Sequence, residues 1–117
     1  MTLREIAAQL HWTELTPELT AQKEAQVRSG HASDLLSDVL AHAPAGGVLV
    51  TIQLHMNVIA VALHAEQAAV VFASGLAPEE PVRQRALKEG LPLFTCAETA
   101  FEAAGRLYAL GLRGRAS

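Results

Sequence analysis

The stretch that decides the fold runs from Ser33 to Asn57 and reads SDLLSDVLAHAPAGGVLVTIQLHMN. Its first part has the spacing of an amphipathic helix, and residues 44–47 hold the proline and glycines of a turn. Residues 48–52, VLVTI, then form a short apolar run enriched in β-branched side chains. Such a run predicts a strand buried on both faces, as in a parallel sheet.

The helix at the start of this stretch is predicted to begin at Ser33. Ser33 has a good N-cap side chain, and Asp34 in the first turn would complement the helix dipole. The helix should end before Pro44, because the residue preceding a proline avoids the α region. Its buried face is predicted to carry Leu35, Leu36, Val39 and Leu40. Its other face is predicted to carry Asp34, Asp38 and His42, which are spaced four residues apart.

The pattern of a strand followed by a helix recurs downstream. Residues 69–73 and 91–95 have strand patterns, and residues 58–66 and 78–89 have helical ones, with a strand as the alternative for residues 58–61. Gly90 fits the C′ position of the helix before it. A last helix would place these residues at helical spacing: Phe101, Ala104, Gly105, Tyr108 and Leu112. Strands alternating with helices predict an α/β fold, with a parallel sheet and helices on both faces.

The N-terminal part is less regular. Thr2 and Glu5 have capping-box spacing, which predicts a helix to about residue 10 with these buried residues: Leu3, Ile6, Ala7 and Leu10. Residues 11–15 alternate as a short edge strand would. Residues 16–31 fit strand, helix or loop, and residues 28–31 have the small, flexible character of a loop.

Composition indicates one domain over residues 1–117. Half of the residues are apolar and 18% are charged, which predicts a packed core. The mean hydropathy is slightly positive, so we expect the excess apolar residues to cover an interface, and a homodimer is predicted. The net charge of -3 argues against a nucleic-acid partner.

Residue usage also predicts a cytoplasmic location. Cys96 is the single cysteine, which suits a reducing compartment and excludes an intrachain disulfide or a cysteine-based zinc site. The first ten residues lack the basic and apolar regions of a signal peptide. The longest apolar run, residues 58–63, is far shorter than the roughly 20 residues that span a bilayer. We therefore expect no membrane partner.

Three loops that follow predicted strands form the candidate binding site. Ligands of open parallel sheets bind at the carboxyl ends of the strands, and the helix after residue 57 would supply free N–H groups for an anion such as phosphate. The alternative is that Gln53 and Asn57 only cap and brace their loop. The candidate residues in the three loops are Gln53, His55 and Asn57, then Ser74 and Gly75, then Thr95.

Catalytic and metal chemistry have weaker support in the sequence. Asp34, Asp38 and His42, with His31 or His55, could ligate a metal, but they also match an ordinary solvated helix face, and no recognised ligand spacing occurs. Cys96 with His55 could form a dyad, although an inert buried thiol is the favoured interpretation. Phosphate-loop, dinucleotide and nucleophile-elbow motifs are absent from the sequence. We therefore predict no enzyme activity, no cofactor and no metal.

Residues 27–62, VRSGHASDLLSDVLAHAPAGGVLVTIQLHMNVIAVA, resemble the DRTGG domain family, and its stand-alone members in particular. The likeness is strongest over residues 33–38, SDLLSD, and residues 51–57, TIQLHMN. The segments GLPL at 90–93 and AFEAAGRLYALG at 100–111 also resemble the family. One departure is that Arg28-Ser29-Gly30 stands where the family has Thr-Gly-Gly, and His31 follows where an aromatic residue is usual.

The resemblance implies an α/β regulatory or dimer-forming module without catalytic activity. Such domains occur beside the kinase module of HPr kinase/phosphorylase relatives and between CBS domains in some inorganic pyrophosphatases, which implies a partner enzyme. Arg28, Gly30 and Asp34 become further candidate ligand contacts, with Arg28 as a source of charge. The leading hypothesis is a homodimeric regulatory domain that binds a nucleotide or another phosphate-containing anion. The alternatives are an interaction module without a ligand and, more distantly, a metal- or cysteine-dependent enzyme.

Overall fold

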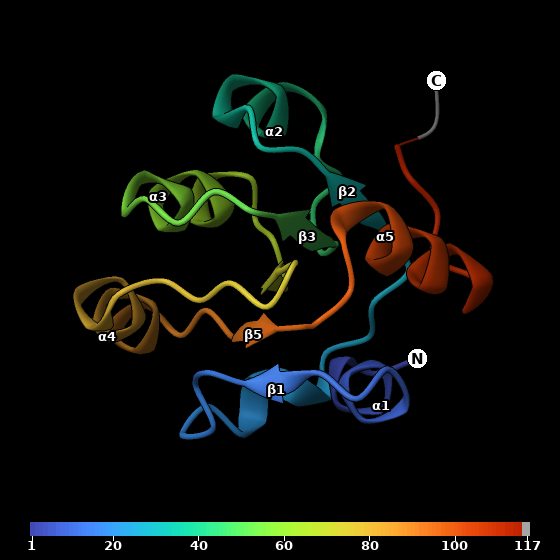
Figure 1. Ribbon diagram of the computed structural model, residues 1–117, viewed down its shortest axis with the longest axis horizontal. Helices are drawn as coiled ribbons and strands as arrows, with labels where there is room; N and C mark the ends of the chain where they lie inside the picture. The colour runs from blue at the N-terminus through green and yellow to red at the C-terminus, as the bar shows by residue number, and fades with distance from the viewer. Residues whose placement is uncertain (116–117) are drawn as a thin grey trace.

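A mostly parallel sheet organises the computed structural model, which describes residues 1–115 (Figure 1). Within these residues the five strands lie in the order β1-β5-β4-β3-β2. The parallel strands are β2 (Gly30–Ala32), β3 (Val48–Thr51), β4 (Ala69–Phe72) and β5 (Leu93–Thr95). Strand β1 (Thr13–Glu14) pairs antiparallel with β5 at one edge. The predicted α/β fold and the predicted edge strand are confirmed.

Helices cover both faces of the sheet (Figure 1). One face carries α2 (Leu36–His42), α3 (Asn57–His64) and α4 (Glu80–Glu89). The other face carries α1 (Leu3–Gln9) and α5 (Ala100–Ala109). A short 3₁₀ turn, η1 (Ala21–Glu24), lies beside α1. No helix in the described residues is both long and apolar enough to cross a membrane.

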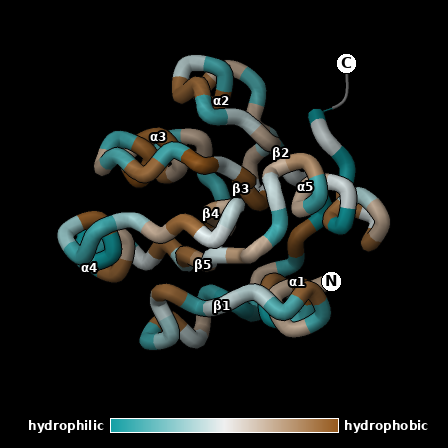
Figure 2. The backbone as a smooth tube through the Cα atoms, in the orientation of Figure 1, coloured by the Kyte–Doolittle hydropathy of each residue, from teal (hydrophilic) through white to brown (hydrophobic). Residues whose placement is uncertain are grey.

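The two central strands supply both halves of the core. Every residue of β3 and β4 is buried. In Figure 2 the central strands of the sheet include hydrophobic segments. Val48 and Val50 of β3 pack with α1 and α5, whereas Leu49 packs with the helices of the opposite face. This division follows from the alternation of side chains along a strand.

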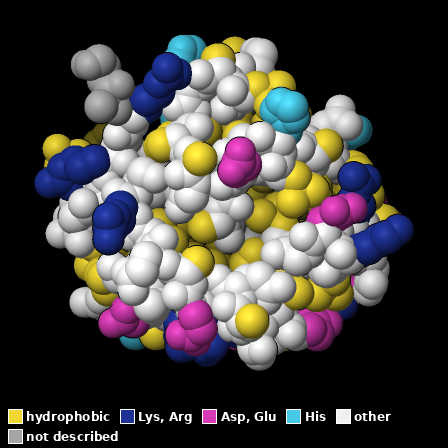
Figure 3. Space-filling view, turned by 180° about the vertical axis from the view of Figure 1, so that it is seen from behind, with side chains coloured by type: hydrophobic (Ala, Val, Ile, Leu, Met, Phe, Trp, Pro, Cys, Tyr) yellow, Lys and Arg dark blue, Asp and Glu magenta, His cyan; other side chains and the backbone are white. Residues whose placement is uncertain are grey.

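Apolar side chains also reach the surface. The side seen in Figure 3, behind the view of Figure 1, has apolar side chains gathered near its centre, and most charged groups lie around its outline. Several large apolar side chains that contribute to the slightly positive mean hydropathy are therefore exposed at the surface.

The two best-defined helix ends match their predictions. The hydroxyl of Thr2 accepts from the Glu5 amide at 3.1 Å, and the Glu5 carboxylate accepts from the Thr2 amide at 2.8 Å. This capping box satisfies two amides at the start of α1. Gly90 ends α4 with φ of +72°, a conformation that favours glycine.

The predicted start of α2 is wrong. Ser33 is not the N-cap, because the helix begins at Leu36 and the Ser33 hydroxyl instead accepts from the Leu35 amide at 3.2 Å. Asp34 lies outside the first turn, where its carboxylate accepts from the Thr51 hydroxyl at 2.9 Å and from the amide of residue 52 at 2.8 Å. Bonds to the end of β3 therefore hold Asp34 in the loop, away from the face that carries Asp38.

The predicted buried face of α2 is half right. Val39 is fully buried and Leu36 packs against the same core, but Leu35 is 66% exposed and Leu40 is 48% exposed. Leu35 lies before the helix and so does not follow its period. The later start of α2 thus removes one of the four residues from the predicted stripe, and Leu40 faces solvent.

The segment predicted as a loop at residues 28–31 overlaps the first two residues of strand β2. Gly30 pairs with Val48 in parallel register. On its outer side, the Gly30 amide donates to the Arg113 carbonyl at 3.0 Å, and the Arg113 amide donates to the Arg28 carbonyl at 3.1 Å. The backbone near the C-terminal end therefore helps to fix β2, a contact that local sequence does not reveal.

Residues 16–27 are a loop with the η1 turn, and buried polar contacts fasten them. The buried Thr16 hydroxyl accepts from the Leu93 amide at 3.0 Å. Lys23 is also buried and forms an ion pair with Glu14 of β1. The loop is thus attached to the edge of the sheet at two points.

Replacement of Thr16 by valine tests the first of these attachments. Thr16→Val keeps the shape but leaves the buried Leu93 amide without its acceptor, so the free energy of unfolding should fall by about 1–3 kcal/mol. Urea unfolding followed by circular dichroism measures the change. Thr13→Val, at an exposed position of β1, is the matched control and should change the stability by less than about 0.5 kcal/mol. Equal stability of the two variants would contradict the role assigned to Thr16.

Candidate functional site

The three predicted loops lie together at the carboxyl ends of the strands, which we call the carboxyl edge of the sheet, because β3, β4 and β5 are parallel. Two of the loops are directly bonded: the amides of Ser74 and Gly75 each donate to carbonyls of the β5–α5 loop at 2.7 Å. The Thr95 hydroxyl donates to the Leu76 carbonyl at 2.6 Å. Ser74, Gly75 and Thr95 are therefore brought together, and these groups hold the two loops to each other.

The loop at residues 53–57 is braced by its own side chains. The Thr51 hydroxyl accepts from the Gln53 amide at 3.0 Å, and the Gln53 side-chain carbonyl accepts from the His55 amide at 3.2 Å. His55 Nδ1 then accepts from the Asn57 amide at 3.1 Å. The side chains of Thr51, Gln53 and His55 thus each bond to the amide two residues further on, so Gln53 braces the loop as the alternative predicted, whereas Asn57 takes part through its backbone amide. Ligand binding by Gln53, His55 and Asn57 stays a prediction.

The first amides of α3 also have partners. Besides the bond from Asn57 to His55 Nδ1, the Val58 amide donates to the His55 carbonyl at 2.9 Å and the Ile59 amide donates to the Met56 carbonyl at 3.1 Å. These bonds leave fewer free N–H groups at the N-terminal end of α3 to bind an anion. Because Nδ1 of His55 accepts, its neutral ring carries the proton on Nε2, which is the donor left for a ligand.

An open pocket of about 430 Å³ lies between the β3–α3 and β4–α4 loops. His55 is the predicted site residue that lines this pocket, and Glu79 supplies a carboxylate to the wall. The other lining residues are apolar: Leu54, Met56, Ala77, Pro81 and Val82. Sequence reasoning missed Glu79 and the apolar wall, because the two loops meet only through the parallel pairing of β3 with β4.

The remaining predicted contacts lie in two different places. Arg28 and Gly30 lie at the amino end of β2, and Gly30 pairs with Val48, the first residue of β3. They are therefore at the opposite edge of the sheet from His55. Asp34 lies at the carboxyl edge, where it is bonded to the end of β3.

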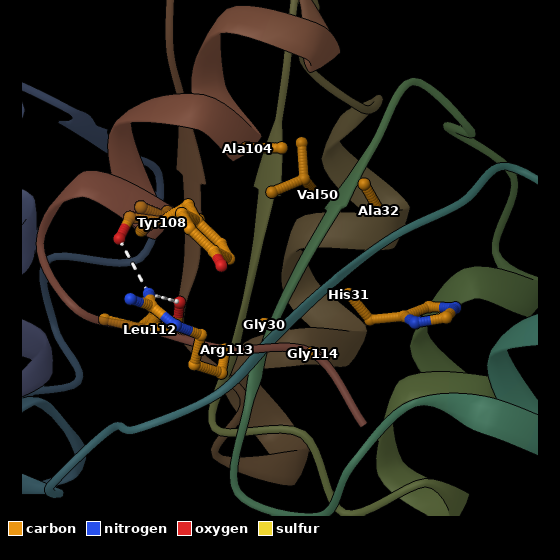
Figure 4. Close-up of a pocket in the computed structure, with 10 residues that line it drawn as sticks. Gly30, His31, Ala32, Val50, Ala104, Tyr108, Leu112, Arg113 and Gly114 are labelled. Carbon is orange, nitrogen blue, oxygen red and sulfur yellow. Dashed lines mark hydrogen bonds between the residues drawn. The ribbon is translucent and has the colours of Figure 1, made fainter. Parts of the chain in front are cut away.

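A smaller cavity of about 130 Å³ lies between β2 and α5 (Figure 4). The guanidinium of Arg113 stacks over the Tyr108 ring at 3.8 Å from its centroid. The same group donates to the carbonyls of Tyr108 and Leu112 at 2.9 and 2.8 Å. The His31 side chain points away from Tyr108 and Arg113, so the cavity is chiefly apolar (Figure 4).

Asp38 connects two histidines on the outer side of α2. Its carboxylate lies 2.7 Å from His31 Nε2 and 3.0 Å from His42 Nδ1. Hydrogen bonds from His31, then from Ser33 and His42, lower the pKa of Asp38 below its ordinary value. Among the described residues, no group of three or more His, Cys, Asp or Glu side chains is placed to hold a metal ion.

Cys96 is a buried thiol. Burial, followed by contacts with Glu98, raises the pKa of Cys96 to about 11, so the thiol form dominates at neutral pH. Its Sγ lies 3.8 Å from the Glu98 carbonyl oxygen, whereas His55 Nδ1 is occupied by the Asn57 amide. These contacts support the inert buried thiol over the dyad.

Comparison with known proteins adds no assignment to this geometry. No protein-family model matches the chain, and no curated protein matches it significantly. The resemblance to DRTGG domains therefore stays a prediction from the residues that carry it.

The lowered pKa of Asp38 predicts an acid-dependent contribution to stability. Hydrogen bonds favour the carboxylate in the folded state, so they stabilise the fold above the unfolded pKa of about 3.9 and are lost as pH falls through the lower folded pKa. Asp38→Asn should therefore have a lower melting temperature than the parent at pH 5–7, and the difference should shrink below about pH 4. Thermal unfolding across this range measures it. Glu66→Gln is the exposed control, and a difference that persists unchanged at pH 3 would contradict the assignment.

The state of Cys96 predicts slow alkylation. Native protein treated with iodoacetamide at pH 7.5 should react at least about 100-fold more slowly than the urea-unfolded chain, because burial and the high pKa both suppress the thiolate. Mass spectrometry of the quenched samples gives the two rates. Equal rates in native and unfolded protein would show that the thiol is accessible and reactive.

Proposed function

We propose that this chain is a non-catalytic regulatory domain that binds a small nucleotide-like ligand at the carboxyl edge of its sheet. The open pocket between the β3–α3 and β4–α4 loops carries this proposal. Its volume of about 430 Å³ falls in the range of small-molecule sites, and its position follows the rule for parallel sheets. The resemblance to DRTGG domains and the protonated, buried Cys96 support a regulatory role over a catalytic one.

The pocket wall suits a flat ring with polar edges. Leu54, Met56 and Val82 offer apolar surface to a ring face. The Nε2–H of His55 can donate to a ring acceptor, and the Glu79 carboxylate can accept from an amino group. A phosphate would be directed away from Glu79 because of its negative charge. These features favour a nucleoside or nucleotide whose base enters the pocket.

A second candidate function is a protein-interaction module without a small ligand. The exposed aromatic side chains of α5 favour it, since Phe101 is 84% exposed and Tyr108 is 60% exposed. Exposed apolar surface of this kind marks interaction sites in many soluble proteins.

Thermal-shift measurements with a panel of nucleosides, nucleotides and inorganic phosphate test the first function. A ligand present at 100 times its Kd stabilises the folded state by about 2.7 kcal/mol, which raises the melting temperature by several degrees. His55→Asn should abolish the rise, because asparagine can still accept from the residue 57 amide but lacks the Nε2–H.

The matched control for this test is His64→Ala, at an exposed position near the end of α3. It should leave the rise in melting temperature unchanged. If no compound in the panel shifts the parent, or if His55→Asn responds as the parent does, the ligand function is overturned.

A further inference from the structure

We propose that the exposed side of α5 is a self-association surface on which a second copy of this chain packs, with the two α5 helices antiparallel across a two-fold axis. The α5 face consists of Phe101, Ala104, Gly105 and Tyr108. The inference rests on the second candidate function and is independent of the ligand pocket, which lies at the loops beside α3 and α4.

The α5 face is apolar although it points away from the core. Phe101 and Tyr108 are seven residues apart, two helical turns, and Ala104 and Gly105 lie between them. The opposite side of the helix packs Ala103 and Leu107 into the core. The α5 face, with Ala32 of β2 and Ala100, lines an open hollow next to the cavity beneath Tyr108. Both sides of α5 therefore carry apolar side chains, and one of them is uncovered in the single chain.

Gly105 has no role that the described chain explains. It lies inside α5, where glycine destabilises a helix relative to alanine. A Cβ built on Gly105 would meet nothing within 4 Å, so packing within this chain does not require glycine there. Glycine also allows another backbone to approach closely, which a second α5 helix packed on this face would use.

The α5 face is complementary to itself. An antiparallel pair centred between Ala104 and Gly105 would place Phe101 of one copy opposite Tyr108 of the other, with the small residues at the crossing. Aromatic side chains pair favourably in offset or edge-to-face geometry. Each copy presents the same patch, as an interface with two-fold symmetry requires.

Charges beside the α5 face also fit an antiparallel pair. Glu98 and Arg106 form an ion pair within the chain. Glu102 lies in the first turn of α5, and Arg113 lies beyond its C-terminal end with its guanidinium over the Tyr108 ring. An antiparallel arrangement brings Glu102 of one copy towards Arg113 of the other, which is attractive. A parallel arrangement would bring like charges together.

Extension of the sheet through β2 is the other way to join two copies, and the structure disfavours it. The first part of the outer edge of β2 is already bonded to the C-terminal segment, through Gly30 and Arg113. Strand β2 ends at Ala32, so a strand from another copy would find a very short edge. The α5 face is therefore the surface that we assign.

The area of the α5 face predicts a weak dimer. Burying an aromatic side chain removes about 150–250 Å² from water, so Phe101 and Tyr108 together contribute about 300 Å² per copy and about 600 Å² per dimer. Alanine and glycine surface adds to this, but stable interfaces usually bury at least about 1,200 Å². We expect a weak, reversible dimer.

Sedimentation velocity of the full chain from about 5 μM to 1 mM tests the inference. The apparent mass should rise with concentration from the monomer value of 12.4 kDa towards twice that value. Phe101→Lys should weaken the dimer at least tenfold, and circular dichroism should confirm that it folds, since Phe101 is 84% exposed. Leu40→Lys, at an exposed leucine of α2, is the matched control and should dimerise as the parent does.

A disulfide experiment tests the geometry. Ala104→Cys places a thiol next to the two-fold axis and should give a cross-linked dimer under mild oxidation, whereas Leu40→Cys should not. A parent chain that stays monomeric at 1 mM, or a dimer that Phe101→Lys does not weaken, would overturn the inference. The two variants distinguish the dimer from the ligand function. Phe101→Lys should keep the ligand-induced rise in melting temperature, and His55→Asn should still form the dimer.

Discussion

The parallel pairing of β3 with β4 is the contact on which the rest of the structure depends. Both strands are buried on both faces, so each of their side chains needs a partner layer above or below the sheet. A buried large aliphatic or aromatic side chain contributes roughly 1.5–3 kcal/mol, and these strands supply seven apolar residues to the two cores. Helices α2, α3 and α4 cover one side, and α1 and α5 cover the other. The polar loops therefore lie at the ends of the strands, and a ligand-binding site can form there.

Sequence patterns predicted the elements whose information is local. The apolar runs of β3 and β4, the capping box at Thr2 and the glycine after α4 each depend on a few neighbouring residues. Strand β2 was not predictable in this way, because Gly30–Ala32 contains no β-branched residue and its outer edge is bonded to Arg113, far along the chain. The start of α2 was misplaced for a related reason: Ser33 has a good capping side chain and Asp34 suits a first helical turn, but the bonds of Asp34 to the end of β3 keep this segment outside the helix.

The candidate site was predictable in position and less so in chemistry. Parallel strands brought the three loops to one edge, as expected. Polar residues at every second position from Thr51 to Asn57 are the sequence signal for the bracing bonds, since the side chains of Thr51, Gln53 and His55 each reach the amide two residues on. The position of Glu79 in the pocket wall could not be predicted from the sequence of either loop alone. It follows from the parallel pairing of β3 with β4, which places the two loops side by side.

Strand β3 also connects the two surfaces that the proposals assign. Val50 lines the cavity beneath α5, and the next residue, Thr51, begins the bonds that brace the loop at His55. Consecutive side chains on a strand point to opposite faces of the sheet. The neighbouring residues Val50 and Thr51 therefore contact the α5 side and the side of the His55 loop, respectively. If a ligand at one surface changed the free energy of association at the other, the effect would be reciprocal. Because a homodimer has two ligand sites, the ratio of dimer dissociation constants without and with saturating ligand would equal the square of the ratio of ligand affinities in dimer and monomer.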